Sequence, residues 1–244
     1  MDERAYLEYR DEAADWLKRG RANLLRGLLA KHLPRGNQLE LLELGAGVGQ
    51  NLPVLSGFGT VNAAEISPIG QSAIRAQGTA RHLYTDPLPF ALERKYDVIC
   101  ALDVIEHIGD DRAALRWVGE HLRHRGVFIA TVPAYGWLFS DHDRSLHHFR
   151  RYTRASFCRA LPEELSVREA AYFNHLLFPL AVAARGLWSL GRMVTGAQPG
   201  KQRSPRWGGA QTVLARVLDL EVELILRGYE PAWGLSVYCV AYRR

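Results

Sequence analysis

Residues 38–51 read QLELLELGAGVGQN, and this stretch decides the fold of the chain. A leucine-rich run that carries Glu43 ends at Gly45, and two more glycines follow at alternate positions, Gly47 and Gly49. An apolar run that stops at glycines and leads into a helix-compatible segment is typical of a buried parallel strand, a tight turn and a helix start. Glycine suits such a turn because its backbone reaches angles that side chains disfavour, and because a ligand can approach the main chain closely.

The next strand-like run covers residues 60–66 and ends with Glu65 and Ile66. A carboxylate at the end of this second strand is placed to accept hydrogen bonds from ribose hydroxyls. The glycine loop and the carboxylate, in this order, predict a nucleoside site. The spacing E-x-G-x-G-x-G differs from the G-x-G-x-x-G of dinucleotide-binding loops and therefore disfavours a dehydrogenase. An ordinary strand, turn and helix without a ligand is the plainer alternative.

The glycine loop resembles the first motif of the class I S-adenosylmethionine (SAM)-dependent methyltransferases, and the chain is similar to type-11 and ubiquinone-pathway members. The resemblance implies that Glu43 lies near the methionine amino group and that Glu65 binds the ribose hydroxyls. It also implies that Asp86 contacts the adenine amine, although an Asp before Pro is also typical of a plain turn. The cofactor-binding residues that the resemblance implies are Glu43, Gly45, Ala46, Gly47, Gly49, Asn51, Glu65, Ile66, Asp86, Leu102 and Asp103.

Strand and helix patterns alternate along most of the chain, which favours an α/β fold with a parallel sheet. We expect a Rossmann-like, doubly wound sheet of seven strands with helices on both faces, mostly parallel. The resemblance adds an antiparallel last strand at the sheet edge. The predicted strands cover residues 39–44, 60–66, 79–84, 96–102, 126–132, 165–173 and 233–242, and the predicted helices 2–32, 50–55, 68–77, 111–123 and 210–227.

We expect one methyltransferase domain over residues 1–244. Its parts are an N-terminal helical cover at 1–36, a cofactor-binding core at 37–173, an apolar and basic insertion at 174–209, and a last helix and edge strand at 210–244. The insertion could pack on the core, form a lid over a lipophilic acceptor, or rest on an anionic membrane surface. The loop that flanks its apolar part is basic, which favours the lid or the membrane contact.

The net charge and the cysteine pattern limit which partners and which cellular compartment we expect for the protein. The chain carries 31 Lys and Arg against 26 Asp and Glu, a formal charge of +5, which permits contact with phosphate or an anionic membrane but fits a solvated basic face equally well. Cys100, Cys158 and Cys239 are too widely spaced for a metal-ligand pair and fit a reducing compartment. The sequence shows neither a signal-peptide core nor a membrane span. We expect a cytoplasmic protein, with a peripheral position on the inner face of the membrane as the alternative.

Methyl transfer from a sulfonium needs chiefly alignment, but a hydroxyl acceptor also needs a base or a metal to take its proton. Residues 103–107, DVIEH, resemble the E-x-x-E-H metal-binding run of some O-methyltransferases, with Asp in place of the first Glu. The resemblance implies Asp103, Glu106 and His107 as candidate ligands of Mg²⁺. In the plainer alternative Glu106 and His107 only shape the cleft.

A second candidate lies in residues 148–153, HFRRYT, which match an H-F/Y-R-R-Y-T run of a bacterial subgroup of type-11-like methyltransferases. We expect His148 to face the acceptor as base or ligand, and Arg150 or Arg151 to orient an anionic substrate. His148 completes an expected catalytic set with His107 and Glu106. The alternative is a surface loop whose arginines pair with nearby acids.

Together these features predict an enzyme that moves a methyl group from SAM to a small lipophilic or anionic acceptor, with oxygen as the preferred target. An RNA methyltransferase is the enzymatic alternative. We do not expect nucleic acid as a partner, because the sequence shows no aromatic-interleaved RNA-binding module. A non-catalytic SAM-binding or membrane-associated protein is the alternative outside enzymes. The oligomeric state is open.

Overall fold

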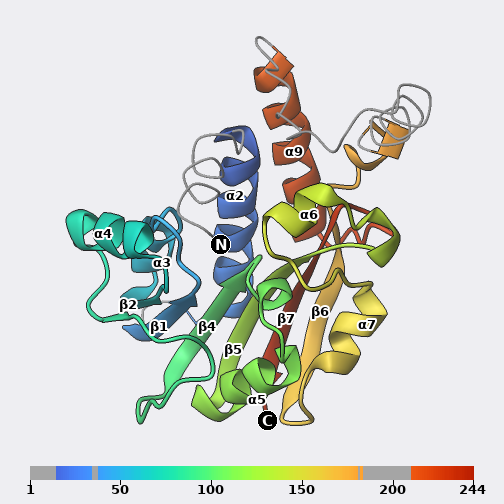
Figure 1. The fold of residues 1–244 in the computed structure, drawn as a ribbon. Coiled ribbons are helices and arrows are strands. Elements are labelled where there is room, and N and C mark those ends of the chain that lie inside the picture. Colours follow the sequence, from blue (N-terminus) through green and yellow to red (C-terminus); the bar gives the residue numbers. More distant parts are fainter. Residues whose placement is uncertain (1–14, 35–37, 181, 184–209) are drawn as a thin grey trace.

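The computed structural model describes residues 15–34, 38–180, 182–183 and 210–244. Its centre is one seven-stranded sheet with the order β3-β2-β1-β4-β5-β7-β6 (Figure 1). The strands are β1 (Leu39–Leu44), β2 (Gly59–Ala64), β3 (Leu83–Tyr84), β4 (Tyr96–Leu102), β5 (Leu122–Pro133), β6 (Leu165–Phe173) and β7 (Ser236–Arg243).

The strand β1 lies between β2 and β4 and is parallel to both, so that Glu43 stands opposite Ala63 on one side and Cys100 on the other. The strand β7 is antiparallel and lies between β5 and β6. The chain therefore winds outward in one direction from β1 and in the other from β4, which places a topological switch point at their carboxyl ends. The predicted doubly wound sheet with an antiparallel last strand is confirmed, but β7 is inserted beside β5 and β6 forms the edge.

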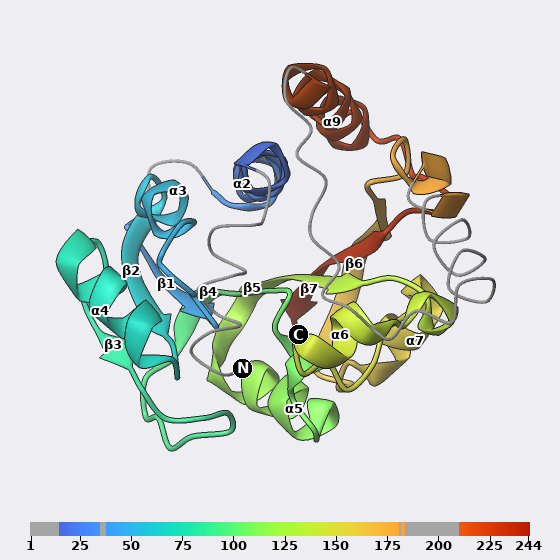
Figure 2. The same ribbon diagram turned by 45° about the horizontal axis from the view of Figure 1, so that its top comes forward.

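Helices cover both faces of the sheet and give two cores (Figure 2). One core packs beneath α2 (Asp15–His32), α3 (Leu52–Ser56), α4 (Pro68–Gln77) and α9 (Ala210–Leu226). The other packs beneath α5 (Asp111–His121) and α7 (Arg154–Ala160). Three short helices, η1 (Ile105–His107), η2 (Gly136–Leu138) and α6 (Asp141–Ser145), follow the carboxyl ends of β4 and β5.

The helices α2 and α9, from the N-terminal and C-terminal parts of the described chain, pack against each other. A Cβ atom on Gly20 would lie 2.1 Å from Cδ2 of Leu218, and one on Gly27 would lie 2.2 Å from Cδ1 of Leu226. Both glycines face α9, so that the two helix backbones approach more closely than a side chain would permit. The expected N-terminal cover is therefore anchored to the last helix as well as to the sheet.

The helix 68–77 and the strands 39–44, 96–102 and 165–173 match the predicted bounds residue for residue. The third strand is shorter than the expected 79–84 and covers only Leu83–Tyr84. The strand β5 is longer than predicted because it begins at Leu122, directly after α5. Leu122 pairs with Tyr96, and the register then shifts so that Val98 pairs with Val127. This irregularity accommodates the charged residues 123–125, which are exposed and hid the start of the strand from a hydrophobic pattern.

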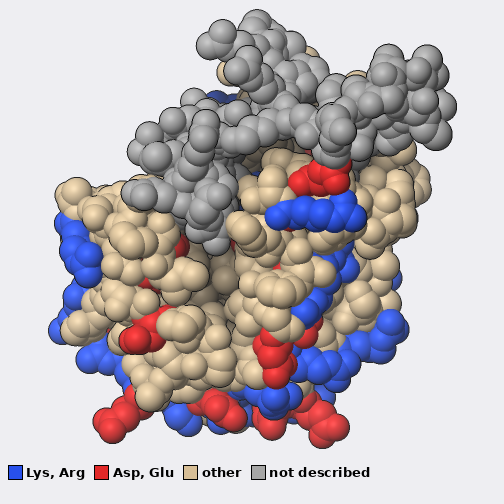
Figure 3. Space-filling model, in the orientation of Figure 1, with Lys and Arg blue, Asp and Glu red and all other residues tan. Residues whose placement is uncertain are grey.

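Several expectations fall on residues outside the described ranges. They are residues 1–14 and 35–36 of the helical cover, residue 37 of the core, and residues 181 and 184–209 of the insertion. The described part of the chain contains no helix that is long and apolar enough to cross a membrane. On the face seen in Figure 3, Lys and Arg lie along the flanks with Asp and Glu among them, and a recess opens in the described surface between α4 and α6.

Candidate functional site

The glycine loop between β1 and α3 lies at the carboxyl edge of the sheet. Its three glycines have positive φ angles of 59°, 60° and 78° at Gly45, Gly47 and Gly49, a region that side chains rarely adopt. At Gly45 a Cβ atom would also lie 2.6 Å from Cγ2 of Val104. The N–H of Ala46 donates to the carbonyl of Ala64 at 3.1 Å, which fixes the loop to the end of β2.

Glu43 is the acid of the first motif, and its side chain is almost entirely buried in β1. Its Oε1 accepts a hydrogen bond from Nδ2 of Asn51 at 2.7 Å, whereas its buried Oε2 has no partner. Burial raises the pKa of the Glu43 carboxyl to about 8, against the opposing effect of the Asn51 hydrogen bond. Asn51 is the N-cap of α3, so that the turn itself brings the amide to the carboxylate.

Glu65 follows β2 and is 6% exposed. One carboxylate oxygen accepts from the N–H of Gly47 and the other from the N–H of Ser67, each at 2.7 Å. Burial raises the pKa of Glu65, and the backbone N–H groups of Ser67 and Gly47 oppose the rise. The second expected acid is thus tied to the glycine loop, and the two carboxylates stand at the ends of adjacent strands.

The other residues expected around the cofactor lie along the same edge. Ile66 is 61% exposed beside Glu65, and Asp86 is exposed in the loop after β3. Leu102 ends β4 and is half-buried. Asp103 follows it with a positive φ of 55° and accepts a hydrogen bond from Oγ1 of Thr131 at 3.0 Å. The carboxylate of Asp103 also forms an ion pair with Arg21.

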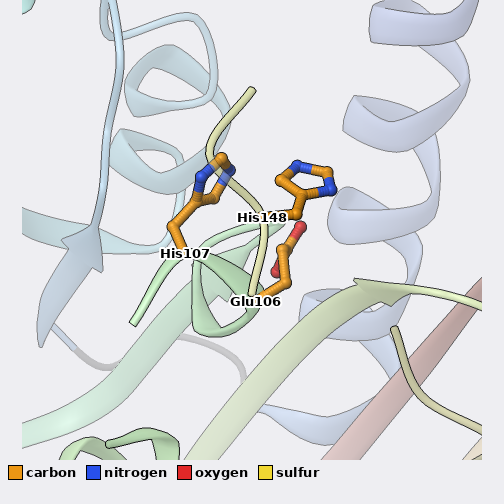
Figure 4. A group of neighbouring side chains, drawn as sticks. All are labelled: Glu106, His107 and His148. Atoms are coloured by element: carbon orange, nitrogen blue, oxygen red, sulfur yellow. The ribbon is translucent and has the colours of Figure 1, made fainter. Parts of the chain in front are cut away.

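The catalytic candidates Glu106, His107 and His148 converge beside this edge (Figure 4). One potential ligand atom from each side chain lies within 4.8 Å of the others. Glu106 is fully buried, neither of its oxygens has a hydrogen-bond partner, and burial raises its pKa well above the usual range. Burial, with the nearby His148, lowers the pKa of His107 to about 4. The structure thus brings His148 to Glu106 and His107, whereas the third metal candidate, Asp103, is outside the group.

Two backbone contacts hold the loop that carries His148. The N–H of Phe149 donates to the carbonyl of Glu106 at 2.8 Å, and the N–H of Tyr152 donates to that of Pro133 at 2.9 Å. Since η1 follows β4 and Pro133 ends β5, the loop is fastened to the ends of two neighbouring strands. His148 therefore comes from a segment remote in sequence yet faces η1 directly.

Asp143 is the buried acid beneath His148. Its Oδ1 accepts from Nδ1 of His148 at 2.9 Å and from Nε of Arg151 at 2.7 Å, and its Oδ2 accepts from the N–H and Oγ of Ser140. Burial opposes ionisation, but the hydrogen bonds from His148 and Arg151 prevail and lower the pKa of Asp143. The local sequence allows this because Ser140 and Asp143 form a capping box at the start of α6. That S-x-x-D spacing was the signal that could have distinguished Asp143 from its neighbours.

Both arginines expected to orient a substrate are paired with carboxylates. Arg151 lies against Asp143, and Nη1 of Arg150 lies 2.8 Å from Oδ1 of Asp111. The hydroxyl of Tyr152 donates to the same Asp111 at 2.6 Å. The geometry matches the alternative in which these arginines pair with nearby acids.

The fold and the edge just described define the class of the protein: it has the fold of the class I SAM-dependent methyltransferases. The particular family follows from the sequence, because a family model described as "Methyltransferase domain" matches residues 3–171. The chain belongs to this methyltransferase family. No curated protein matches the sequence.

Solved structures of methyltransferases share the fold at low sequence identity. The plantazolicin methyltransferase BpumL, in complex with SAH, is 11% identical with a TM-score of 0.60, over 99% of this chain and 89% of that one. The N-methyltransferase NodS from Bradyrhizobium japonicum WM9, in complex with S-adenosyl-L-homocysteine (SAH), is 14% identical with a TM-score of 0.57. The match covers 96% of this chain and 91% of NodS. A SAM-dependent methyltransferase from Clostridium acetobutylicum ATCC 824 is 12% identical with a TM-score of 0.56. The match covers 92% of this chain and 91% of that protein.

Proposed function

We propose that this methyltransferase transfers the methyl group of SAM to an oxygen of a small lipophilic or anionic acceptor. The observation that carries the proposal is the pair of buried acids, Glu43 and Glu65, at the ends of adjacent strands on either side of the glycine loop. SAM, when bound, supplies a methyl group on a sulfonium and leaves as SAH. Among the structural neighbours, NodS and BpumL are named as complexes with SAH.

The residues at this edge fit SAM group by group. Glu43 has a buried oxygen without a partner, which suits the ammonium of the methionine portion. Glu65 already uses two backbone N–H groups to fix its orientation, and each oxygen keeps a lone pair for a ribose hydroxyl. Exposed Ile66 and half-buried Leu102 offer apolar contacts for the adenine, and Asp86 offers an acceptor for its amine.

The acceptor side of the proposal rests on Glu106, His107 and His148. Methyl transfer forms a bond from the acceptor oxygen to the methyl carbon and breaks the bond from that carbon to sulfur, so a hydroxyl acceptor must also lose its proton. Asp143 holds Nδ1 of His148, which leaves Nε2 toward the acceptor as a base or as the ligand of a cation. Buried Glu106 and half-buried His107 lie beside His148 in the same group.

The proposed acceptor class rests on the amino-acid sequence of the insertion. The apolar insertion 174–209 and its basic loop support a lipophilic or anionic acceptor, and they support a peripheral position at an anionic membrane as part of the same proposal. A small RNA is the alternative acceptor, supported by the excess of basic residues and the DVIEH run.

Titration calorimetry with SAM, and separately with NAD, tests the donor assignment. We expect SAM to bind and NAD not to bind. Glu65→Gln should weaken SAM binding at least about tenfold, because a charge-assisted hydrogen bond contributes about 1.5–3 kcal/mol. Glu93→Gln, at an exposed acid away from the edge, is the matched control and should bind SAM as the wild type does. Binding of NAD without SAM, or equal SAM affinity in both variants, would refute the assignment.

A further inference from the structure

We propose that Glu106, His107 and His148 form a binding site for one divalent transition-metal ion. Their potential ligand atoms lie within 4.8 Å of one another at the carboxyl edge of the sheet, as Figure 4 shows for the three side chains. Binding of the ion follows from these residues alone. Only its role in deprotonating an acceptor rests on the proposed function.

Glu106 lacks the hydrogen-bond partners that a buried carboxyl group normally has. Its side chain is fully buried, and neither carboxylate oxygen has a hydrogen-bond partner. Leaving two polar atoms of one side chain buried without a partner is costly, and buried carboxylates are normally paired or bound to a metal. In Figure 4 the carboxylate points toward the ring of His148. An ion between them would give the buried carboxylate a partner.

Each imidazole of the group has a further hydrogen-bond partner. Nδ1 of His148 lies 2.9 Å from Oδ1 of Asp143, so the remaining nitrogen, Nε2, is the one available to an ion. His107 hydrogen-bonds to the backbone of Leu146. Histidines that bind metals almost always donate their other ring nitrogen to a carboxylate or a backbone carbonyl, which fixes the tautomer and the ring orientation.

The support of His148 is itself rigid. Asp143 has no exposed surface, and Ser140 and Arg151 fix its two oxygens from both sides. The charge of Arg151 balances that of Asp143, so Glu106 is the carboxyl of the three-residue group that is left for a cation. A bound divalent cation would compensate the charge of the Glu106 carboxylate in this buried place.

The donor set selects the kind of ion. Two imidazole nitrogens and one carboxylate suit Zn²⁺, Fe²⁺, Co²⁺ or Mn²⁺ and leave open positions for an oxygen ligand, whereas Mg²⁺ and Ca²⁺ prefer oxygen donors throughout. Asp103, which would have supplied a second carboxylate, is engaged by Arg21 and Thr131. The site therefore differs in both ligands and ion from the Mg²⁺ site expected from the DVIEH run. A bound ion would act as a Lewis acid on an acceptor hydroxyl.

The test is a titration of chelator-treated full-length protein with Co²⁺, without SAM or acceptor. We expect about one Co²⁺ per chain, with visible absorption bands that report nitrogen and oxygen ligands, and excess Mg²⁺ should not displace it. Glu106→Gln and His148→Gln should weaken Co²⁺ binding at least about tenfold, and Asp143→Asn about ten- to a hundredfold. His124→Gln, at an exposed histidine in β5, is the control and should bind as the wild type does.

The Co²⁺ titration can overturn the proposed metal site in several ways. Absence of stoichiometric Co²⁺ binding to the wild type overturns it, whatever the variants do. Binding that Glu106→Gln and His148→Gln leave unchanged, in variants whose circular dichroism matches the wild type, also overturns it. Displacement of Co²⁺ by equimolar Mg²⁺ contradicts the donor set. Because SAM is absent from the titration, failure of SAM binding would refute the proposed donor and leave the metal site standing.

Discussion

The guanidinium of Arg21, in the middle of α2, forms an ion pair with the carboxylate of Asp103, the residue that follows β4. The contact brings the N-terminal helix to the carboxyl edge of the sheet, beside the glycine loop. The hydroxyl of Thr131 donates a hydrogen bond to the carboxylate of Asp103, which adopts a positive φ of 55°. The helix thus contributes to the site as well as to the core.

Arg21→Gln should lower the free energy of unfolding by about 1 kcal/mol, since the pair is partly buried but still reached by solvent. Arg19→Gln is the matched control on the same helix, because Arg19 pairs with Asp219 at 3.2 Å on a more exposed surface. It should change the stability by less than about 0.5 kcal/mol. Urea denaturation of the three proteins measures the difference. Equal losses in both variants would mean that the Arg21–Asp103 pair adds nothing beyond a surface contact.

Gly45→Ala should reduce both stability and SAM binding. Its φ of 59° costs an alanine about 1 kcal/mol, and the new Cβ would meet Val104 at 2.6 Å, which forces the loop to move. Gly78→Ala separates the two effects, because Gly78 has a φ of 68° and no atom within 4 Å of the new Cβ. We expect thermal unfolding to show a loss of about 1 kcal/mol for Gly78→Ala and about 2–4 kcal/mol for Gly45→Ala. A loss at Gly45 no larger than that at Gly78 would contradict the packing argument.

The sequence predicts where the glycine loop and its two acids lie in the fold, because their geometry is local. A strand, three glycines and a helix start place Glu43 and the loop within fourteen residues, 38–51. Glu65 then follows from the parallel pairing of the next strand. Each of these positions is fixed by backbone rules that act over a few residues.

The acceptor side depends on contacts that are distant in sequence, and there the sequence predicts the residues better than their partners. His148 reaches η1 only because Phe149 bonds to the carbonyl of Glu106 across the fold. Arg150 meets Asp111 for the same reason. A hydrophobic pattern carries no information on which acid will neutralise which arginine. The resemblance of the DVIEH run likewise implied Asp103 beside Glu106 and His107, whereas the fold brings His148 to these two residues.

Asp143→Asn should destabilise the protein by about 3–5 kcal/mol, because it leaves the buried guanidinium of Arg151 without a counter-charge. Asp141→Asn is the control in the same short helix, where Asp141 pairs with Arg144 on an exposed surface. We expect the control to change stability by less than about 0.5 kcal/mol in urea denaturation. A comparable effect of the two substitutions would show that the Asp143–Arg151 pair does not stabilise the loop of His148.

The contribution of Glu43 to the stability of the unliganded protein should fall as the pH rises from about 4.5 to 8. The pKa of Glu43 is raised from 4.5 in the unfolded chain to about 8 in the folded one, so between these values the native state holds a proton that the unfolded state has lost. This contribution is therefore complete below pH 4.5, falls through this window by a few kcal/mol at most, and is lost above pH 8. The difference in unfolding free energy between the wild type and Glu43→Gln isolates it, because Glu65, Glu106 and His107 titrate in both proteins. A difference that does not change with pH in the apo proteins would contradict the assignment.

Binding of SAM should release a proton from Glu43 near pH 7. With a pKa of about 8, the buried carboxyl is mostly protonated at that pH, and its free oxygen lies where the methionine ammonium is proposed to bind. An ammonium beside the carboxyl favours the ionised form, so the proton passes to the buffer. Calorimetry in two buffers with different ionisation enthalpies measures this release as the slope of the binding enthalpy. We expect a release approaching one proton per SAM in the wild type and in Glu93→Gln, and none in Glu43→Gln. The same release in Glu43→Gln would mean that the proton comes from another group and that Glu43 does not meet the ammonium.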